Sequence, residues 1–530
     1  MNKQINYILT CSNNNVIRLN NSVPWNIKED LEYFNKLALN NMIIMDLCTF
    51  ESLNNNPLKN CLNIIITSKY EEYQNQPNLI FLSSIENAIY YGQINPTINI
   101  IWIIGIYEHI YKIKPDNIFI TRIHIEIESE NKIILSNQFF TYIEDNYNYL
   151  LIETNNYFDH ISNQELQCDY IHFTIISKKN KIDIIISNSN NINNSDNIYL
   201  NLVKDTLLNG SFRSTRNDYT FSDFGSQIEF NMNNGFPLLT TKKMPFKMIF
   251  EELMFFINGY TDNKILKEKN IHIWDLNTNF DFINSNKKYY QIPQVQKKLL
   301  KENDMGPMYG FQWRYFNALY KCTNNEENKI FYETLGIDQL YKVINELLND
   351  PFSRRILMTS FNPQQVDNGV LYPCHSIIIQ FYCTQIKDNN FNSDNNFNSD
   401  NNFNSDNNFK SNNNLNVSIK MYQRSADLFL GLPFNIASTS LLLHIICNYL
   451  NNKSNNYIYH PDRVIITLGD THIYQSHINA VLTQLQNKPK IFPKLTIKIN
   501  NHENITDYTF SDMLLENYNH CGVITAKMIA

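Results

Sequence analysis

Paired cysteine spacings are absent from this sequence of 530 residues. Its nine cysteines are an odd number, they are scattered along the chain, and none belongs to a Cys-x-x-Cys motif. This pattern argues against a secreted disulfide framework and against a cysteine-ligated zinc site. It is typical of a protein in a reducing compartment, so we predict a cytoplasmic location and no bound metal.

Long apolar runs and an excess of positive charge are also missing. The first residues, MNKQINYILTCSNNN, hold too short an apolar run for a signal peptide. No window approaches the roughly 18 apolar residues of a membrane span. Lys and Arg number 44 against 51 Asp and Glu, a net charge of -7. We therefore expect no membrane contact and no general affinity for nucleic acids, with RNA binding for autoregulation left open.

Asparagine is over-used, and its densest stretches mark the organisation of the chain. The length exceeds that of a usual single domain, and the polar stretch SNSNNINNSDN separates a front part from a back part. We predict domains at 1–182 and 197–530, joined by a short polar linker at 183–196. The Asn-rich repeat between two strand-like runs is too polar to bury a core, so residues 385–414 are predicted to form a disordered loop at a hairpin tip.

The two parts differ in their hydrophobic patterns. In the front part, short apolar runs such as NMIIM, NIIIT and NIIWIIG alternate with helical stretches, which predicts an α/β domain. The back part is mixed. In its segment MPFKMIFEELMFFING, Pro245 suits a helix start and Gly259 a C-terminal cap. Glu252 then lies in a helix with apolar residues all round, where a carboxylate is costly unless it has a task or a partner.

Cys374, in the segment LYPCHS, is the residue with the sharpest choice of roles. Free cysteines are mostly buried and inert, so a packing role is the first alternative. A nucleophilic role needs nearby positive charge that favours the thiolate. Arginines that could supply it, and together could hold a phosphate, lie in the segments SRRI, YQRS and FRSTR, at Arg354, Arg355, Arg424 and Arg216.

From about Asn197 to Ala530 the chain resembles thymidylate synthase. The motifs that carry the resemblance are long and follow the family's order: FPLLTTKK, EELMFFINGYTDN, IHIWDLN, GPMYGFQWR, SRRI, YPCHS, YQRSADLFLGLPFNIAS, LGDTHIYQSH and ITAKMIA. The resemblance implies an α+β fold, a homodimer formed through the sheet, and methylation of dUMP to dTMP by 5,10-methylenetetrahydrofolate with release of dihydrofolate. Cys374 would attack C6 of the uracil ring, with Arg424 close enough to favour the thiolate.

The resemblance also implies a role for each further motif residue. Glu252 would organise water and proton transfer, and Tyr309 would help to remove the C5 proton. The dUMP phosphate would be held by Arg216, Arg424, Ser425 and, from the other subunit, Arg354 and Arg355. The base and the sugar would contact Asn435, whose amide fits uracil and mismatches cytosine, and His472 and Tyr474. The folate would contact Trp274, Asn277, Asp427 and Gly431, with Asp427 also a catalytic residue.

Some positions keep alternatives. The family's phosphate loop carries two glycines after its arginine that are absent from RNDYTF here, so Arg213 is the alternative to Arg216. Lys242 is a candidate contact of the folate's glutamate tail, with a solvated surface lysine as the alternative. His375 and Trp313 are interpreted as structural residues.

Residues 5 to about 180 resemble dihydrofolate reductase, a fold with a mixed and mostly parallel sheet. The reductase-then-synthase order is that of the bifunctional enzymes of protozoa and plants. Matching segments include SVPWNIKEDLEYF, MIIMDLCTFESL, IFITRIHIEIE and YIHFTII. Asn26 can cap a helix with Glu29, which would place Asp30 and Phe34 on one face for a pterin ring. Trp25 and Thr121 match family positions beside Asp30, the catalytic carboxylate of this half. For Asp30 alone, a carboxylate favoured by the helix dipole is the alternative.

The segments that would bind NADPH depart from the family pattern. Arg18 stands where the family has glycine, Asp46 and Leu47 replace its glycine and basic residue before Thr49, and its Gly-Gly turn is reduced to Gly105. Cys61 replaces the arginine that holds the folate α-carboxylate. We predict a synthase joined to a reductase-like domain with weak or absent NADPH-dependent activity. A fully active bifunctional enzyme is one alternative, and a non-catalytic folate- or RNA-binding scaffold is another.

Overall fold

The computed structural model describes residues 3–20, 22–106, 109–175, 196–215, 218–285, 300–321, 323–326, 328–386, 413–498 and 501–529. The chain divides into two compact units, one of residues 1–190 with 478–486 and one of residues 191–477 with 487–530. Arg216, nearly all of the predicted linker and most of the predicted Asn-rich loop lie outside the described residues. Within the described ranges, no helix combines the length and the apolar character needed to cross a bilayer.

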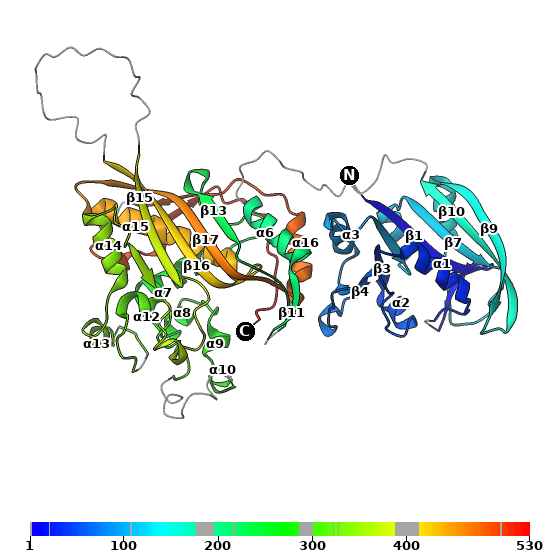
Figure 1. Cartoon of the computed structure of the whole chain (residues 1–530), viewed down its shortest axis with the longest axis horizontal. Helices are drawn as coiled ribbons and strands as arrows, with labels where there is room; N and C mark the ends of the chain where they lie inside the picture. The colour runs from blue at the N-terminus through cyan, green and yellow to red at the C-terminus, as the bar shows by residue number, and fades with distance from the viewer. Residues whose placement is uncertain are drawn as a thin grey trace, which may run out of the picture. The chain divides into compact units, whose positions relative to one another are not determined.

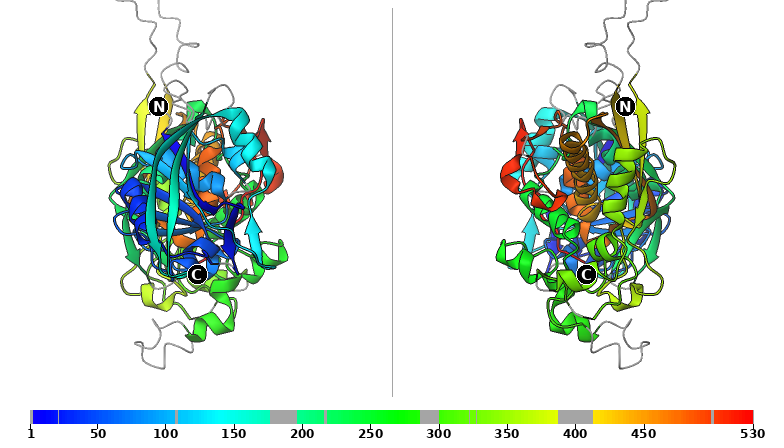
Figure 2. Two further views of the ribbon diagram at one scale, coloured as in Figure 1. Left: turned by 90° about the vertical axis from the view of Figure 1, so that its right-hand side faces the viewer. Right: turned by 90° about the vertical axis from the view of Figure 1, so that its left-hand side faces the viewer.

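The first unit is built on an eight-stranded sheet of order β5-β4-β3-β6-β1-β7-β10-β9. Its strands are β1 (Gln4–Ser12), β3 (Met42–Asp46), β4 (Leu62–Ile66), β5 (Leu79–Leu82), β6 (Ile100–Ile104), β7 (Asn117–Ile123), β9 (Tyr147–Asp159) and β10 (Gln164–Ile175). The pairs among the first six are parallel, and β10 runs antiparallel to β7 and β9. Figure 2 shows β9 and β10 at this edge. The predicted mixed, mostly parallel sheet is confirmed.

Short apolar runs form these strands because the sheet is covered on both faces, as parallel sheets usually are. The strand residues Ile43, Met45, Ile65 and Trp102 are buried in one core cluster. The covering helices are α1 (Lys28–Ala38), α2 (Leu47–Ser52), α3 (Ile85–Ile94), α4 (Ile110–Ile113) and α5 (Asn137–Asn146). A separate two-stranded sheet joins β2 (Val16–Leu19) to β8 (Lys132–Ile134).

The second unit is built on a sheet of order β11-β12-β17-β16-β15-β14, with β13 also paired to β17 (Figure 1). Its strands are β11 (Ser211–Ser214), β12 (Tyr219–Phe224), β13 (Gln227–Asn231), β14 (Leu357–Thr359), β15 (Ile378–Gln385), β16 (Asn414–Asp427) and β17 (Ile458–Tyr474). A small sheet pairs β18 (Lys494–Ile497) with β19 (Met513–Glu516). Strands β15 and β16 pair antiparallel, as expected for the two arms beside the Asn-rich repeat.

One face of this second sheet is covered by helices. The long helix α15 (Gly431–Lys453) packs against β16 and β17 and touches α7 and α14, beside which it lies in Figure 2. The other helices of this unit are α6 (Asp196–Asn209), α7 (Phe246–Ile257), α8 (Lys264–Glu268), α9 (Asp275–Thr278), α10 (Phe280–Ser285), α12 (Gly310–Tyr315), α13 (Lys329–Glu333) and α14 (Gln339–Asn349). Helix α16 (Ile478–Gln486) belongs to the first unit, where it packs against α3. Helix α7 begins directly after Pro245, and Gly259 follows it with a φ of +70°, as predicted. The strands and helices agree with the predicted α+β class.

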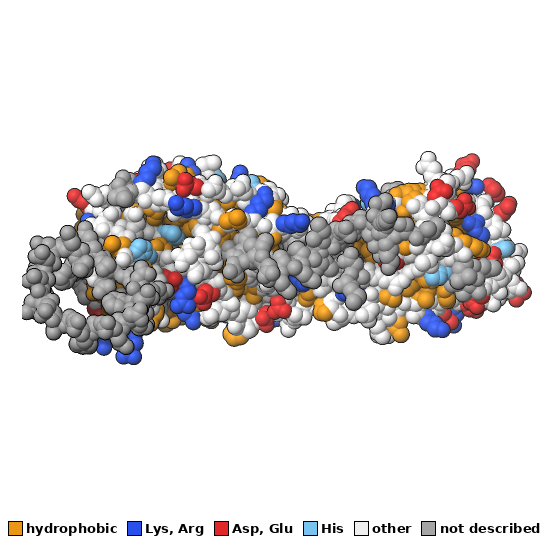
Figure 3. All heavy atoms as spheres, turned by 90° about the horizontal axis from the view of Figure 1, so that it is seen from above, with side chains coloured by type: hydrophobic (Ala, Val, Ile, Leu, Met, Phe, Trp, Pro, Cys, Tyr) orange, Lys and Arg blue, Asp and Glu red, His pale blue; other side chains and the backbone are white. Residues whose placement is uncertain are grey.

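The surface has no dominant charge sign in the view of Figure 3. Basic and acidic side chains are interspersed over the described part of the face drawn there. This distribution fits the modest net charge of -7.

Candidate active site

Strand β16 holds the segment that contains Cys374. The thiol residue is half-buried just before β15, and its carbonyl oxygen accepts hydrogen bonds from the backbone N–H groups of Arg424 at 2.8 Å and Ser425 at 3.3 Å. The Arg424 guanidinium donates to the carbonyls of Pro373 at 3.1 Å and Tyr372 at 3.3 Å. The thiol is therefore partly accessible on a backbone that is fixed at several points.

The hydroxyl of Tyr309 lies against this cysteine. Its oxygen is 3.4 Å from Sγ of Cys374 and accepts the Cys374 N–H at 3.1 Å. Tyr309 has a φ of +40°, which bulky residues rarely adopt and which is retained where the surrounding structure enforces it. Burial and the neighbouring Cys374 raise the pKa of Tyr309 well above its ordinary value. The phenol therefore keeps its proton at neutral pH and can both donate and accept.

Two packed rings support Tyr309. Phe256 of α7 stacks on it at 5.0 Å between ring centres, and His375 stacks on it at 4.5 Å. Gly310 allows the approach of α7, because a Cβ there would lie 2.2 Å from the Phe256 carbonyl oxygen. Burial lowers the pKa of His375 to about 4, so its imidazole is neutral. Trp313 is buried next to Phe256, in agreement with a packing role.

Glu252 is a buried carboxyl with one strong partner. It projects from α7 and accepts a hydrogen bond from Nε1 of Trp274 at 2.8 Å. Burial raises its pKa to about 7 despite that bond, so the group can give or take a proton near neutral pH. The Trp274 ring also meets the Tyr309 ring at 5.9 Å, and Asn277 is buried one turn further on. Glu252, Trp274, Tyr309 and Cys374 thus form one connected group.

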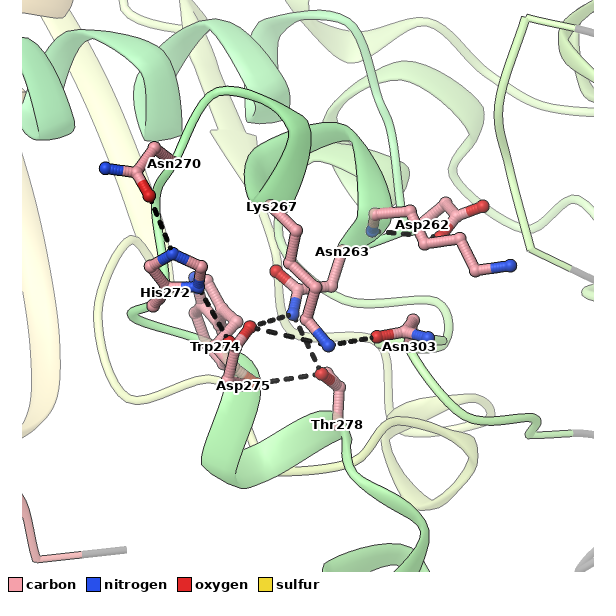
Figure 4. A network of polar contacts seen from close by, with 10 residues as sticks. Asp262, Asn263, Lys267, Asn270, His272, Trp274, Asp275, Thr278 and Asn303 are labelled. Carbon is pink, nitrogen blue, oxygen red and sulfur yellow. Dashed lines mark hydrogen bonds and ion pairs between the residues drawn. The ribbon is translucent and has the colours of Figure 1, made fainter.

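A polar network fixes the short helix α9, which Trp274 precedes (Figure 4). One carboxylate oxygen of Asp275 accepts from Nδ2 of Asn263 at 2.9 Å and lies 3.7 Å from Nζ of Lys267. The other lies 2.9 Å from Nδ1 of His272. The same Asn263 amide donates to the Thr278 hydroxyl at 3.0 Å. The network therefore joins both ends of α9 to α8 and holds Trp274 toward Glu252.

Asp427 closes β16 and turns the chain into α15. Its carboxylate accepts the N–H groups of Phe429 at 2.9 Å and Leu430 at 3.1 Å, and Nδ1 of His477 lies 3.6 Å away. Burial acts to raise the pKa of Asp427, but the hydrogen bond and charge of His477, with the Leu430 N–H, outweigh it and the pKa is lowered. Asp427 is therefore an ionised acceptor at neutral pH.

Lys242 is buried, so the surface alternative for this residue is wrong. Its ammonium donates to the Phe429 carbonyl and lies 3.7 Å from the centre of the Phe429 ring. Burial lowers its pKa to about 7, although the charge of Asp427 opposes the shift. The lysine is held inside the structure next to Asp427.

Three further predicted residues lie around this turn. Ser425 is half-buried on β16, Gly431 begins α15, and Asn435 is buried one turn into α15. Because Ser425 and Asp427 are two residues apart on one strand, their side chains share a face.

The end of β17 contributes His472 and Tyr474, whose rings meet at 4.9 Å. Nδ1 of His472 lies 2.8 Å from Asp470, and the other oxygen of Asp470 accepts from Arg213 at 3.1 Å. Arg213 is exposed on β11. It therefore already has a carboxylate partner.

Arg354 and Arg355 are exposed just before β14. Within the described ranges, neither guanidinium makes an ion pair. Both charges are thus available to a group that is not part of the described chain.

The first unit assembles a second candidate site around Asp30. Its carboxylate, half-buried on α1, accepts from Thr10 at 2.9 Å and from Thr121 of β7. Burial raises its pKa, although both hydroxyl hydrogen bonds oppose the shift. Trp25 is buried, and Phe34 lies one turn after Asp30 and packs on the sheet core. Of the predicted residues, Thr121 thus contacts Asp30, while Trp25 and Phe34 pack in two different core clusters.

The predicted cap of α1 is wrong. The helix begins at Lys28 with Ile27 as its N-cap, and no side chain caps it. Asn26 instead donates its backbone N–H to Asp159 at 2.8 Å, a residue at the end of β9. This distant contact fixes the start of the helix in place of the local capping box.

The three segments predicted for NADPH converge. Nη2 of Arg18 lies 2.9 Å from the Asp46 carboxylate and also donates to the Thr49 hydroxyl. Asp46 caps α2 by accepting the Thr49 N–H at 2.7 Å, and Gly105 contacts the same group of side chains. Cys61 is buried with its thiol 3.3 Å from the Ala38 carbonyl, so this position supplies no positive charge.

Comparisons with known proteins agree with both halves. The family model for thymidylate synthase matches residues 197–530, and that for dihydrofolate reductase matches residues 4–174. A bifunctional dihydrofolate reductase-thymidylate synthase of Paramecium tetraurelia is 31% identical over 532 residues, which cover 99% of each chain. The chain belongs to the bifunctional dihydrofolate reductase-thymidylate synthase family.

Other relatives show the same division. A bifunctional dihydrofolate reductase-thymidylate synthase of Zea mays is 30% identical over 549 residues, covering 96% of this chain and 93% of its own. A thymidylate synthase of varicella-zoster virus is 38% identical over 323 residues, covering 61% of this chain and 90% of its own. The chain is thus a thymidylate synthase fused to a dihydrofolate reductase domain, and the scaffold alternative is not favoured.

Sequence reasoning missed three partners in this bifunctional family member. Asp470 and His477 both stand in the quoted motif LGDTHIYQSH, where the alternation of Asp470, His472 and Tyr474 on one strand face was a usable signal. His477 contacts Asp427 across the unit, and Thr10 contacts Asp30 from β1. No local pattern marks those two contacts.

Proposed function

We propose that the second unit carries out the thymidylate synthase reaction with Cys374 as its nucleophile. The contact between Cys374 and Tyr309, beside the buried Glu252–Trp274 pair, carries this proposal. The thiolate adds to C6 of dUMP and its electron pair moves to C5, which then attacks the methylene group of 5,10-methylenetetrahydrofolate. Loss of the C5 proton expels tetrahydrofolate as the bond between the methylene carbon and N5 breaks. Tetrahydrofolate then transfers a hydride to the exocyclic methylene, which becomes the methyl group, the bond from C6 to sulfur breaks, and dTMP and dihydrofolate are released.

Tyr309 and Glu252 serve the proton transfers. The Tyr309 hydroxyl, close to Sγ, helps to remove the C5 proton through a water. Glu252 has a pKa of about 7 and orders water at the uracil O4 and the folate N5. Both roles fit groups that are protonated, or half protonated, at neutral pH.

The proposed dUMP contacts come mainly from strands β16 and β17 and from helix α15. Arg424 and Ser425 hold the phosphate from β16, with Arg216 as a further ligand; the ion pair between Arg213 and Asp470 favours Arg216 over the alternative Arg213. The amide of Asn435 reads the O4 and N3 edge of uracil. His472 and Tyr474 bind the deoxyribose hydroxyl.

The folate lies on the other side of this group. Trp274 packs against the pterin, Asn277 lines the same wall, and Asp427 accepts hydrogen bonds from the pterin as the ionised group described above. Gly431 leaves room at the start of α15. Lys242 supports the folate side from its buried place next to Asp427.

We propose that the enzyme is a cytoplasmic homodimer that pairs through the open face of its second sheet. Large apolar side chains are exposed on strands of that sheet, among them Leu357, Ile378 and Tyr382. Exposed apolar patches of this kind typically mark protein interfaces. Arg354 and Arg355 then reach the phosphate of the partner's dUMP. The proposed domain bounds are 1–182 and 197–530, with the linker at 183–196 and an Asn-rich loop at 385–414.

Reduction of dihydrofolate with NADPH in the first unit is the second candidate function. The carboxylate of Asp30 with its Thr10 and Thr121 hydroxyls favours it, because a partly buried carboxylate suits the amino group and N3 of a pterin. The segments around Arg18 and Asp46 do not favour it.

The decisive experiment replaces Cys374 with alanine and measures turnover of dUMP together with dUMP binding. We expect turnover to be abolished while dUMP binding is largely kept, because the arginines and Asn435 remain. The exposed Cys521 offers a matched control, and Cys521→Ala should retain turnover. Turnover by the Cys374 variant would contradict the proposal.

A further inference from the structure

The Arg18, Asp46 and Thr49 side chains form a closed group that we call the Arg18 cluster. Nη2 of Arg18 lies 2.9 and 3.3 Å from the two carboxylate oxygens of Asp46. The arginine side chain is nine-tenths buried, and that of Asp46 is about two-thirds buried. Opening such a pair leaves an uncompensated charge in a poorly solvated place, which is strongly unfavourable. The positive charge of Arg18 is thus already neutralised within the chain.

Gly105 shows that this cluster fills a backbone cradle. Its φ is +74°, and a Cβ added to it would lie 2.0 Å from Oγ1 of Thr49, 3.1 Å from Nη2 of Arg18 and 3.2 Å from Oδ1 of Asp46. A glycine in this conformation normally offers bare backbone to a closely approaching phosphate. Here the chain's own polar side chains cover that surface, and the Asp46 carboxylate would repel a phosphate group. The residues present do not fit the pyrophosphate of NADPH.

The pterin side of the same unit has kept its groups. The Asp30 carboxylate accepts hydrogen bonds from Thr10 and Thr121, and Trp25 is buried close to the start of the same helix. Within the described ranges, the side chains that contact the Asp30 carboxylate are those of Thr10 and Thr121, and neither belongs to the Arg18 cluster. Recognition of a pterin by a carboxylate therefore does not depend on the segments that have changed.

We infer that the first unit is a pterin-binding module that works without a nicotinamide cofactor. The Arg18 cluster fills the place where the cofactor's phosphates would bind. The inference rests on the proposed function in one respect, namely that the first unit keeps the reductase's pterin site. Its ligands are pterins and dihydrofolates, which it holds without reducing them. The unit then acts as a folate-holding partner of the synthase.

The test uses the full chain in a preparation that already converts dUMP to dTMP, so that failure of the synthase is scored separately. Calorimetric titration with NADPH should show no saturable binding up to millimolar concentration, and NADPH absorbance should stay constant when dihydrofolate is added. A diaminopteridine without a glutamate tail should bind and quench tryptophan fluorescence. Saturable NADPH binding, or oxidation of NADPH, would overturn the inference.

Matched variants locate the two halves of the inference. Asp30→Asn should weaken the diaminopteridine about tenfold or more, since it removes a charged hydrogen-bond acceptor, while the exposed neighbour change Glu29→Gln should leave it unchanged. The double change Arg18→Gly with Asp46→Gly, shown to be folded by its diaminopteridine binding, should gain saturable NADPH binding. Failure of the wild-type chain to bind the diaminopteridine, or equal binding by Asp30→Asn, would refute the pterin site. A folded double variant without NADPH affinity would refute the inference that the Arg18 cluster blocks the binding of the NADPH phosphates.

Discussion

Glu252 is a residue whose burial, which suits its proposed catalytic role, costs stability. Burial raises its folded-state pKa from 4.5 to about 7, while the unfolded chain ionises at the ordinary value. The stabilising contribution of the protonated group is fully present below pH 4.5 and is lost as the pH rises through about 7. The loss is about 3 kcal/mol. Glu252→Gln should therefore gain stability relative to wild type as the pH rises from about 4.5 to 8, while its turnover falls by orders of magnitude.

Urea unfolding of the synthase transition at a series of pH values measures this difference. Subtracting variant from wild type cancels the other titrating groups, provided that they are independent of Glu252. Glu268 is an exposed carboxylate on α8 and provides the control. The free energy of unfolding of Glu268→Gln should stay within about 0.5 kcal/mol of wild type at every pH. A constant difference between Glu252→Gln and wild type over this range would show that the carboxyl is not destabilised by its burial.

At the same scale, the sequence predicted candidate site residues better than it predicted the side chains that contact them. Cys374 and Asp30 could be singled out because long motifs surround them. The ion pair of Arg18 with Asp46 could not, because the two residues are 28 positions apart and meet only through the sheet. Burial of Lys242 was missed for a similar reason, since a lysine in a polar segment is normally solvated. The positive φ of Tyr309 arises from tertiary packing and leaves no local pattern.

At the scale of elements, predictions succeeded where the determining signals are local. Helix α7 runs from Phe246 to Ile257 between Pro245 and Gly259, whose conformational preferences act within one turn. Helix α1 differs, because Asp159 of β9 takes the N–H of Asn26 and fixes the chain before the helix begins. The parallel strand order was predicted only as a class, since register depends on contacts between distant segments.

Helix α9 is too short to be stable alone, so its position depends on the network around Asp275. Asp275→Ala should remove one hydrogen-bond acceptor of the Asn263 amide, which lowers the free energy of unfolding by about 1 to 3 kcal/mol. It should also loosen the contact of Trp274 with Glu252. We expect the folate KM to rise about ten- to a hundredfold while the dUMP dissociation constant is nearly unchanged. Steady-state kinetics with each substrate varied in turn separates the two quantities.

The more exposed His272 provides the comparison for this network. His272→Ala removes only one contact of Asp275, so its folate KM should rise less than that of Asp275→Ala. Asp275→Asn keeps an acceptor for Asn263 and should fall between the two. An equal rise in the dUMP dissociation constant and the folate KM would mean that Asp275 supports the whole unit, and not specifically the position of Trp274 on the proposed folate side.

At the scale of the whole molecule, Arg354 and Arg355 give the proposed dimer a functional test. Both are exposed and make no ion pair within the described ranges, which fits residues that act in a partner's site. One variant carries Cys374→Ala, and a second carries both Arg354→Ala and Arg355→Ala. Each should be nearly inactive when it forms dimers by itself. Mixed under conditions that allow subunit exchange, half of the dimers become hybrids, each with one site that has both an intact cysteine and intact arginines. About a quarter of wild-type activity should return.

The hybrid dimer explains why recovery requires two chains. A chain that carries all three changes, mixed with Cys374→Ala, offers no intact cysteine anywhere and must stay inactive, which controls for residual activity after exchange. Sedimentation of the mixture confirms that dimers have re-formed. If re-formed dimers recover nothing, the arginines serve their own chain, and the four phosphate ligands then belong to one subunit. Recovery near a quarter instead assigns each site to both chains, so that the synthase cannot work as a monomer whatever the state of its first unit.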